Sequence, residues 1–317
     1  MTRRLLLIGL VALAVGAAQP VAERGGSEEA AARAAQREAE AAHEAAAQKA
    51  LTDSLTDALA MLKHGSARAK EEAANGIAQM AIETTISQPF HPVTFRNACV
   101  RAGILPELVA LLKTPYSTST AGGGGPLHAL RALEAIATDD PNTELDNGHA
   151  LATCEAGAVP PSVKLLSSLD EPIQVAAAGL AAVLAENPQC QTMLLKAGAV
   201  PPLVRLGSFG GDGAKLRALA ALDLLALNHP AALQAIANSG GRQLLEGVRR
   251  YGGETLKGLT AELLDGLDAP SKQTVTVDTA AHARQAHQAR LKHSKVWQSA
   301  SQPVRRAMAP GQHPEQE

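Results

Sequence analysis

The sequence predicts an all-α fold, an α-solenoid of about five helical repeats, on three observations. A short element, Ala-Gly followed by Ala or Ile, then Val or Leu, then Pro, occurs at residues 102–106, 156–160 and 197–201. Its glycine recurs, since 41 residues separate Gly157 from Gly198 and 42 separate Gly198 from Gly240. Hydrophobic residues make up 46% of the 317 but aromatic residues only 2%, so few residues favour strands. A period near forty residues indicates one supersecondary unit that buries its apolar face by stacking on its neighbours.

The first interval between these marker glycines is longer, with 54 residues from Gly103 to Gly157. The run Tyr116–Gly125, YSTSTAGGGG, is typical of a flexible loop. Removing about ten residues there brings this interval close to the others. We therefore expect an ordinary repeat that carries an inserted loop.

Each repeat alternates short and long helical segments. Gly198 suits the C′ position of a helix, where left-handed backbone geometry is needed. Pro201 suits the first turn of the next helix, which is predicted over 202–206 and ends at Gly207. A longer helix is predicted over 214–228. Its leucines keep helical spacing and form one buried stripe: Leu216, Leu219, Leu222 and Leu225.

This order of short helix, turn, long helix and Ala-Gly turn resembles the armadillo repeat. The resemblance rests on the Ala-Gly-x-x-Pro element and on the long-helix segments 64–81 and 171–188, and it covers roughly residues 50–268. It implies a right-handed superhelix whose long third helices line a concave groove for extended peptides. In nuclear-import adaptors these helices carry a Trp and an Asn. Here Trp is absent from them, which argues against a receptor for nuclear localisation sequences, and the Asn position falls at Gln79, Ala135, Val183 and Leu224.

Composition divides the chain into four segments: 1–22, a signal peptide or anchor; 23–50, an Ala/Glu-rich helical spacer; 51–268, the solenoid; and 269–317, a basic, mostly disordered tail. The spacer lacks large apolar residues at its a and d positions, which favours a solvated helix over the alternative of a coiled coil or partner helix. For the tail, the alternative is a basic peptide that binds an acidic partner or folds back into the groove.

The solenoid is expected to be capped at both ends by atypical repeats, a first one from Leu51 and a degraded fifth over 240–267. Between the first two repeats, Gln88–Arg96 is predicted to be a loop. Its two phenylalanines are predicted to fill the core at the end of the stack.

The first segment determines the expected compartment. Arg3 and Arg4, an apolar run over 5–15 and small residues at 16–18 are typical of a secretory signal. The apolar run is too short to span a bilayer comfortably. We expect the secretory pathway or secretion, with an organelle lumen or an uncleaved membrane anchor as alternatives. A membrane is an expected partner only if this segment stays uncleaved.

The three cysteines are predicted to be small buried hydrophobes whose thiols stay reduced because they are buried. Cys99, Cys154 and Cys190 occupy apolar positions and form no Cys-x-x-Cys pair. Their odd number would leave at least one thiol without an intramolecular partner in a secreted chain.

No catalytic, cofactor or metal constellation is found in the sequence, so we expect neither an enzyme nor a cofactor. The spacing of His282, His287 and His293 does not place all three on one helix face. The glycine-rich stretches 122–125 and 207–213 follow no strand and lack the Gly-Lys-Ser/Thr ending of a phosphate loop. Both are predicted to be turns.

The expected partner is a protein or peptide. The formal charge of −2 gives no global reason to bind nucleic acid. The groove helices carry mainly Ala, Leu and Val, which favours a hydrophobic or amphipathic partner helix over a basic extended peptide. The candidate partner-binding residues are the polar side chains assigned to these helices: Gln79, Arg131, Glu134, Lys215, Arg217 and Asp223.

Two functional hypotheses follow from this organisation. The first is a non-catalytic scaffold that binds another protein through the groove. Plant and algal armadillo proteins of the ubiquitin-ligase kind are similar in their repeats, but the U-box that they need is missing. The alternative is a secretory-pathway co-chaperone, a nucleotide-exchange factor for a heat-shock chaperone. Such factors combine a signal peptide, a helical N-terminal region and a few armadillo-like repeats.

Overall fold

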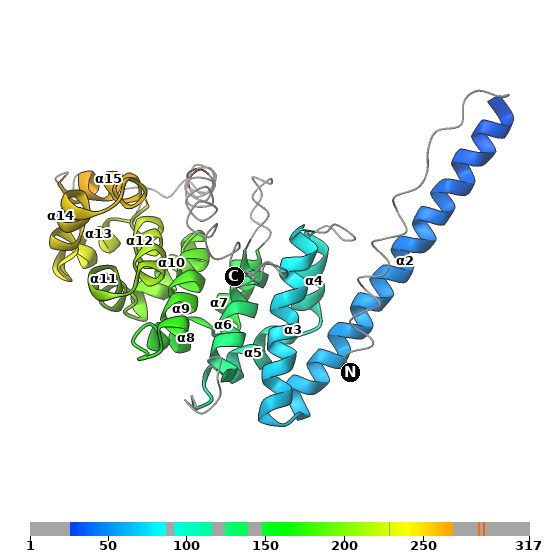
Figure 1. The fold of residues 1–317 in the computed structure, drawn as a ribbon, viewed down its shortest axis with the longest axis horizontal. Helices are drawn as coiled ribbons and strands as arrows, with labels where there is room; N and C mark the ends of the chain where they lie inside the picture. The colour runs from blue at the N-terminus through cyan, green and yellow to red at the C-terminus, as the bar shows by residue number, and fades with distance from the viewer. Residues whose placement is uncertain are drawn as a thin grey trace, which may run out of the picture.

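The computed structural model describes residues 26–86, 92–115, 124–138, 148–227 and 229–268, together with residues 285 and 288. Within them every regular element is a helix, from α2 to α15, and the helices stack into an elongated solenoid (Figure 1). The predicted leader at 1–22, the three tail histidines and almost all of 269–317 lie outside the described residues. Among the described residues, no helix is both long enough and apolar enough to span a bilayer.

The helices fall into five repeats, the first with two helices and the others with three. The first repeat contains α2 (Gly26–His64) and α3 (Ala67–Ile86). The second contains α4 (Pro92–Arg101), α5 (Ile104–Leu112) and α6 (Gly124–Ala137). The third contains α7 (His149–Glu155), α8 (Val159–Leu165) and α9 (Glu171–Leu184). The fourth contains α10 (Pro188–Lys196), α11 (Val200–Phe209) and α12 (Asp212–Ala226). The fifth contains α13 (Pro230–Asn238), α14 (Gly241–Tyr251) and α15 (Glu254–Asp268).

The last helices of the repeats form a continuous layer, which we call the third-helix row: α3, α6, α9, α12 and α15. Each packs against the next along the chain, so the row runs the length of the solenoid. The remaining helices pack against this row and against one another, both within a repeat and between neighbouring repeats. This arrangement confirms the predicted all-α solenoid.

Helix α2 is partly a free arm. It projects away from the solenoid as a long helix (Figure 1). Residues 33–46 and 48–50 are exposed, whereas Leu51, Leu55 and Leu62 are buried, so packing begins at Leu51. The predicted spacer and the start of the first repeat are therefore one uninterrupted helix, within which only the second part has a leucine stripe.

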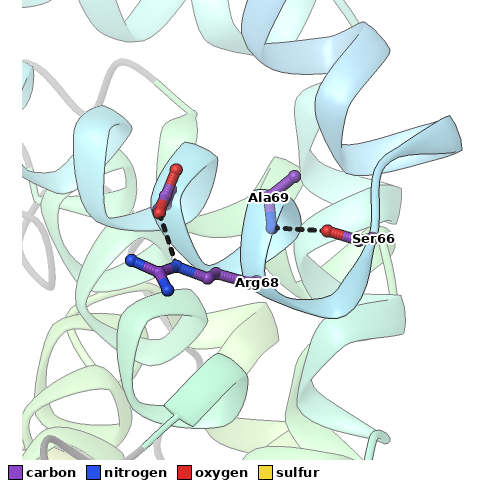
Figure 2. A network of polar contacts seen from close by, with 4 residues as sticks. Ser66, Arg68 and Ala69 are labelled. Carbon is purple, nitrogen blue, oxygen red and sulfur yellow. Dashed lines mark hydrogen bonds and ion pairs between the residues drawn. The ribbon is translucent and has the colours of Figure 1, made fainter. Parts of the chain in front are cut away.

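The start of α3 is fixed by local polar contacts. Ser66 Oγ accepts a hydrogen bond from the backbone N–H of Ala69 at 3.3 Å, which satisfies one of the donors that a helix leaves free at its N-terminus (Figure 2). One turn on, Arg68 Nε lies 3.0 Å from Glu72 Oε1. Such an i,i+4 pair stabilises an exposed helix by a few tenths of a kcal/mol, roughly 0.3–0.5.

Gly198 has the predicted left-handed backbone geometry, and the other three marker glycines share it. All four have positive φ, between +72° and +88°. At Gly198 the N–H groups of Gly198 and Ala199 donate to the carbonyls of Leu195 and Leu194, each at 3.0 Å. This is the Schellman arrangement, which satisfies the last carbonyls of α10 before the chain enters α11. A residue with a Cβ would be strained in this left-handed conformation.

The core is built mainly from leucine and alanine. Leu130 of α6, Leu180 of α9 and Leu219 of α12 are fully buried, and they lie on successive members of the third-helix row. Alanines fill much of the rest of the same helices, and small side chains allow helix axes to approach closely. The leucine stripe predicted for α12 is buried throughout.

Several predicted boundaries were wrong, among them that of the long helix predicted over 214–228, which is α12 at Asp212–Ala226. Helix α11 continues through Gly207 to Phe209. A Cβ at Gly207 would lie 2.8 Å from Leu244 of α14, so this glycine allows close packing and does not end a helix. Gly124 and Gly125 belong to α6 and not to the inserted loop. Helix α4 starts at Pro92, so the second part of the predicted Gln88–Arg96 loop is helical. Phe95 on it is fully buried, as the core prediction requires.

Candidate partner-binding face

An ion pair crosses the middle of the third-helix row. Arg217 of α12 donates from Nη1 to Oε1 of Glu134 on α6, although 83 residues separate them in sequence. Helix α9 packs against both α6 and α12 and lies between them. The two side chains therefore meet above α9 and connect the second repeat with the fourth.

Gly179 of α9 makes room for this ion pair. A Cβ placed on Gly179 would lie 2.6 Å from Glu134 Oε1 and 2.9 Å from Arg217 Cζ, and it would overlap the Nη1 atom. Gly179 is helical and has no positive φ, so what it supplies is space. Any side chain at this position would displace the pair.

Two of the other candidate residues lie on exposed parts of the row. Arg131 of α6 is exposed and precedes Glu134 by three residues, so both lie on one face of the helix. Gln79 of α3 is also exposed. The structure thus brings Glu134 and Arg217 together at Gly179, with Arg131 one turn before Glu134 on α6 and Gln79 on the neighbouring helix of the row.

The remaining two candidates do not join this group. Lys215 lies two residues before Arg217, and residues at that spacing do not share a helix face. Asp223 is only 7% exposed. Helix α12 packs against α9 on one side and α15 on the other, which leaves a narrower free face than the sequence pattern alone indicates.

His128 does not add a charge to the group near neutral pH. Burial lowers its pKa below the ordinary value, and the nearby charge of Arg131 lowers it further, whereas Glu71 opposes the shift. The imidazole is therefore neutral at pH 7, and the positive charge of this face comes from the arginines.

Two buried polar residues that the sequence analysis missed support the row from behind. Arg96 of α4 donates to the Ala135 carbonyl at 3.2 Å, and Gln191 of α10 donates to the Leu224 carbonyl at 2.8 Å. Ala135 and Leu224 are equivalent positions near the ends of α6 and α12. Arg96 and Gln191 each precede their marker glycine by seven residues. This shared spacing is the sequence feature from which the two residues could have been predicted.

The cysteine prediction needs correction at two of its three positions. Cys154 of α7 and Cys190 of α10 form a disulfide, with their Cα atoms 6.1 Å apart. This separation lies within the usual range for disulfides. Both residues are buried, as predicted, but they are not reduced thiols. The bond links the third repeat to the fourth, and Cys99 remains as a free, buried thiol.

Burial raises the pKa of the Cys99 thiol to about 12 from its ordinary value of 9.0, although Arg96 opposes the shift. Between these two values the unfolded chain releases the proton and the folded chain keeps it. The contribution of Cys99 to stability is therefore complete below pH 9 and is lost as the pH rises toward 12, by about 1.4 kcal/mol per pH unit.

Urea unfolding from pH 8 to pH 11 should show a smaller decline in the free energy of unfolding for Cys99→Ala than for the wild type. Equal slopes would contradict the buried thiol.

Within the described residues there is no group of three or more His, Cys, Asp or Glu side chains that could hold a metal ion. Of the stretch 207–213, predicted to be a turn, only Gly210 and Gly211 lie between α11 and α12, and the other residues are helical.

The arrangement of the helices defines the class of the protein as an all-α solenoid, in which repeats of mostly three helices present a row of long third helices. Solved structures then specify the repeat type, which is armadillo-like. A designed armadillo repeat protein in complex with the peptide (KR)4 superposes with a TM-score of 0.56 at 24% identity, over 67% of this chain and 81% of the other.

Two further solved structures agree. Another designed armadillo repeat protein has a TM-score of 0.56 at 22% identity, over 74% of this chain and 99% of that one. The armadillo-repeats-only protein of Plasmodium falciparum has a TM-score of 0.51 at 19% identity, over 63% of this chain and 80% of that one. No family model and no curated protein matches the chain. The similarity therefore concerns the fold.

Proposed function

We propose that this protein is a non-catalytic scaffold that binds a segment of another protein on its third-helix row. The observation that carries the proposal is the Glu134–Arg217 ion pair across Gly179, with the exposed Arg131 one turn before Glu134 on the same helix. Polar side chains placed in this way fix the register and orientation of a bound chain through hydrogen bonds. The designed armadillo protein that holds a peptide supports peptide recognition by this fold.

The proposed compartment is an oxidising one, in the secretory pathway or outside the cell. Disulfides persist in such compartments and are rare in the cytosol. The Cys154–Cys190 bond therefore supports the expectation drawn from the basic and apolar residues at 1–22.

A pull-down with charge reversal on the row tests the proposed function. Full-length wild type and Arg131→Glu are immobilised and exposed to extract from the source cells. Arg131 is exposed, so the variant is expected to fold normally while losing a contact that interfaces often depend on. Partner recovery should fall about tenfold, which corresponds to roughly 1.4 kcal/mol.

The matched control is Lys196→Glu, which reverses an exposed charge on α10, outside the third-helix row. It should retain every partner that the wild type captures. Equal recovery by wild type and Arg131→Glu, with both folded by circular dichroism, would place the binding surface elsewhere.

A further inference from the structure

Most of the exposed large hydrophobic side chains of the described residues lie on one edge of the solenoid. Four such side chains are exposed: Leu169, Met193, Phe209 and Tyr251. Leu169 lies between α8 and α9, Phe209 is the last residue of α11, and Tyr251 is the last residue of α14. These three are 104%, 87% and 82% exposed, and each lies where the second helix of a repeat leads into the third. We call them the edge anchors.

The edge anchors occupy equivalent positions in three consecutive repeats. They are 40 and 42 residues apart (209−169 and 251−209), close to the spacing of the marker glycines. The turns that carry them are neighbours. Arg205 Nη2 of α11 donates to Ser167 Oγ at 2.5 Å, and Leu244 of α14 lies where a Cβ on Gly207 of α11 would be. Single exposed hydrophobic residues are ordinary, but a row in register with the repeats indicates an interaction surface.

The charges beside the edge anchors have almost no net sign. Within five residues of an anchor, the chain carries four positive side chains, Lys164, Arg205, Arg249 and Arg250, and five negative ones, Asp170, Glu171, Asp212, Glu246 and Glu254. Surfaces that bind anionic membranes carry an excess of Lys and Arg beside their apolar residues. A carboxylate follows every edge anchor within three residues, which opposes insertion into such a membrane. The charge count therefore favours neither a lipid surface nor a strongly charged partner.

The two signs of charge lie on opposite sides of the row. All four positive side chains precede their anchor, on the second helices α8, α11 and α14. Four of the five negative side chains follow their anchor, at the starts of the third helices α9, α12 and α15, and only Glu246 departs from this order. The row of anchors thus separates a basic strip from an acidic strip. A two-fold axis along the row would place the basic strip of one copy on the acidic strip of another.

From this self-complementary charge pattern we propose that two copies of the chain associate through this edge, with each edge anchor against its own equivalent in the second copy. A second copy has the same repeat period, so three anchors meet three anchors in register. A buried aromatic side chain covers roughly 150–250 Å². Three anchors and the two charged strips together approach the area of about 800 Å² per partner that specific interfaces bury. The expected product is a reversible dimer.

The inference goes beyond the proposed function, because the edge lies at the helix turns and the partner-binding residues lie on α6 and α12 of the third-helix row. A dimer formed through the edge would carry two third-helix rows. Two linked binding surfaces hold a bivalent partner more tightly than one surface does, without any new contact.

Sedimentation velocity of the full chain tests the dimer, over a concentration range of about 1 to 100 µM that suits an interface at the lower end of the usual size range. The wild type should change from the monomer mass to the dimer mass as its concentration increases. Phe209→Ser removes the middle anchor and should weaken dimerisation at least about tenfold. Met193→Ser is the matched control, because it changes an exposed apolar residue of α10 away from the edge, and it should dimerise like the wild type.

Cysteine cross-linking tests the arrangement of the two copies. Leu169→Cys and Tyr251→Cys are each made in a Cys99→Ala background, which removes the free thiol. Under mild oxidation each variant should form a covalent dimer with itself, because equivalent anchors face each other. Dimers that link Leu169→Cys only to Tyr251→Cys in a mixture would overturn the proposed arrangement.

The dimer is rejected if the wild type keeps the monomer mass at every concentration, or if Phe209→Ser dimerises as strongly as the wild type. Sedimentation of a monomeric wild type with vesicles of phosphatidylserine and phosphatidylcholine, lost in Phe209→Ser, would assign the edge to a lipid surface instead. Circular dichroism should show that every variant is folded. The pull-down with Arg131→Glu judges the proposed function separately, since that residue lies outside the edge.

Discussion

Replacing Cys154 and Cys190 together by alanine is expected to lower the free energy of unfolding by about 3–4 kcal/mol. The reason is that the disulfide closes a loop in the unfolded chain and so lowers the conformational entropy of the unfolded state. The disulfide joins residues 36 apart in sequence and ties the first helices of the third and fourth repeats together. Repeats in a solenoid contact only their neighbours, so a covalent link between two of them reinforces the interface that the packing of α9 on α12 and of α7 on α10 already forms.

Urea unfolding with and without dithiothreitol measures this effect. On reduction the wild type should lose most of the unfolding free energy that the disulfide contributes. The unfolding free energy of the double variant should not change with dithiothreitol. Cys99→Ala serves as the control, because Cys99 is a free thiol and its removal should leave the effect of dithiothreitol intact. Titration of three free thiols in the denatured, unreduced protein would show that the bond is absent.

The parts of the fold that the sequence predicts are those decided within one repeat. Gly198 was predicted to adopt left-handed geometry, and it and the other three marker glycines all have positive φ because a helix must end locally at each of them. Gly207 shows where prediction from a single repeat fails. A glycine near the end of a short helix indicates a stop, but Leu244 from the next repeat packs where its Cβ would be, and the helix continues.

The features that the sequence did not predict depend on how repeats stack. Cys154 precedes its marker glycine by three residues and Cys190 precedes its own by eight, so they are not equivalent repeat positions. Only the packing of α7 against α10 brings them together. Glu134 and Arg217 were both candidate residues, but their pairing was not predicted. The pair forms because α9, which lies between them, has a glycine where the two side chains meet.

Replacing Leu180 by alanine is expected to cost roughly 2–5 kcal/mol of unfolding free energy, through lost burial and the cavity left behind. Leu180 is fully buried on α9, the central helix of the third-helix row, which packs against α6 and α12. Few aromatic side chains are available to fill a gap, since they make up 2% of the chain, so the cavity should collapse poorly.

Leu169→Ala is the matched control, because it makes the same change eleven residues away at a side chain that is 104% exposed. It should alter stability by less than about 0.5 kcal/mol. Urea denaturation followed by circular dichroism compares the two variants directly. Because each repeat is held by its neighbours, damage at α9 should also weaken the coupling between the two halves of the solenoid and lower the m value as unfolding loses cooperativity. Similar stabilities for the two variants would mean that the third repeat does not hold the stack together, and the solenoid described here would then lack its central interface.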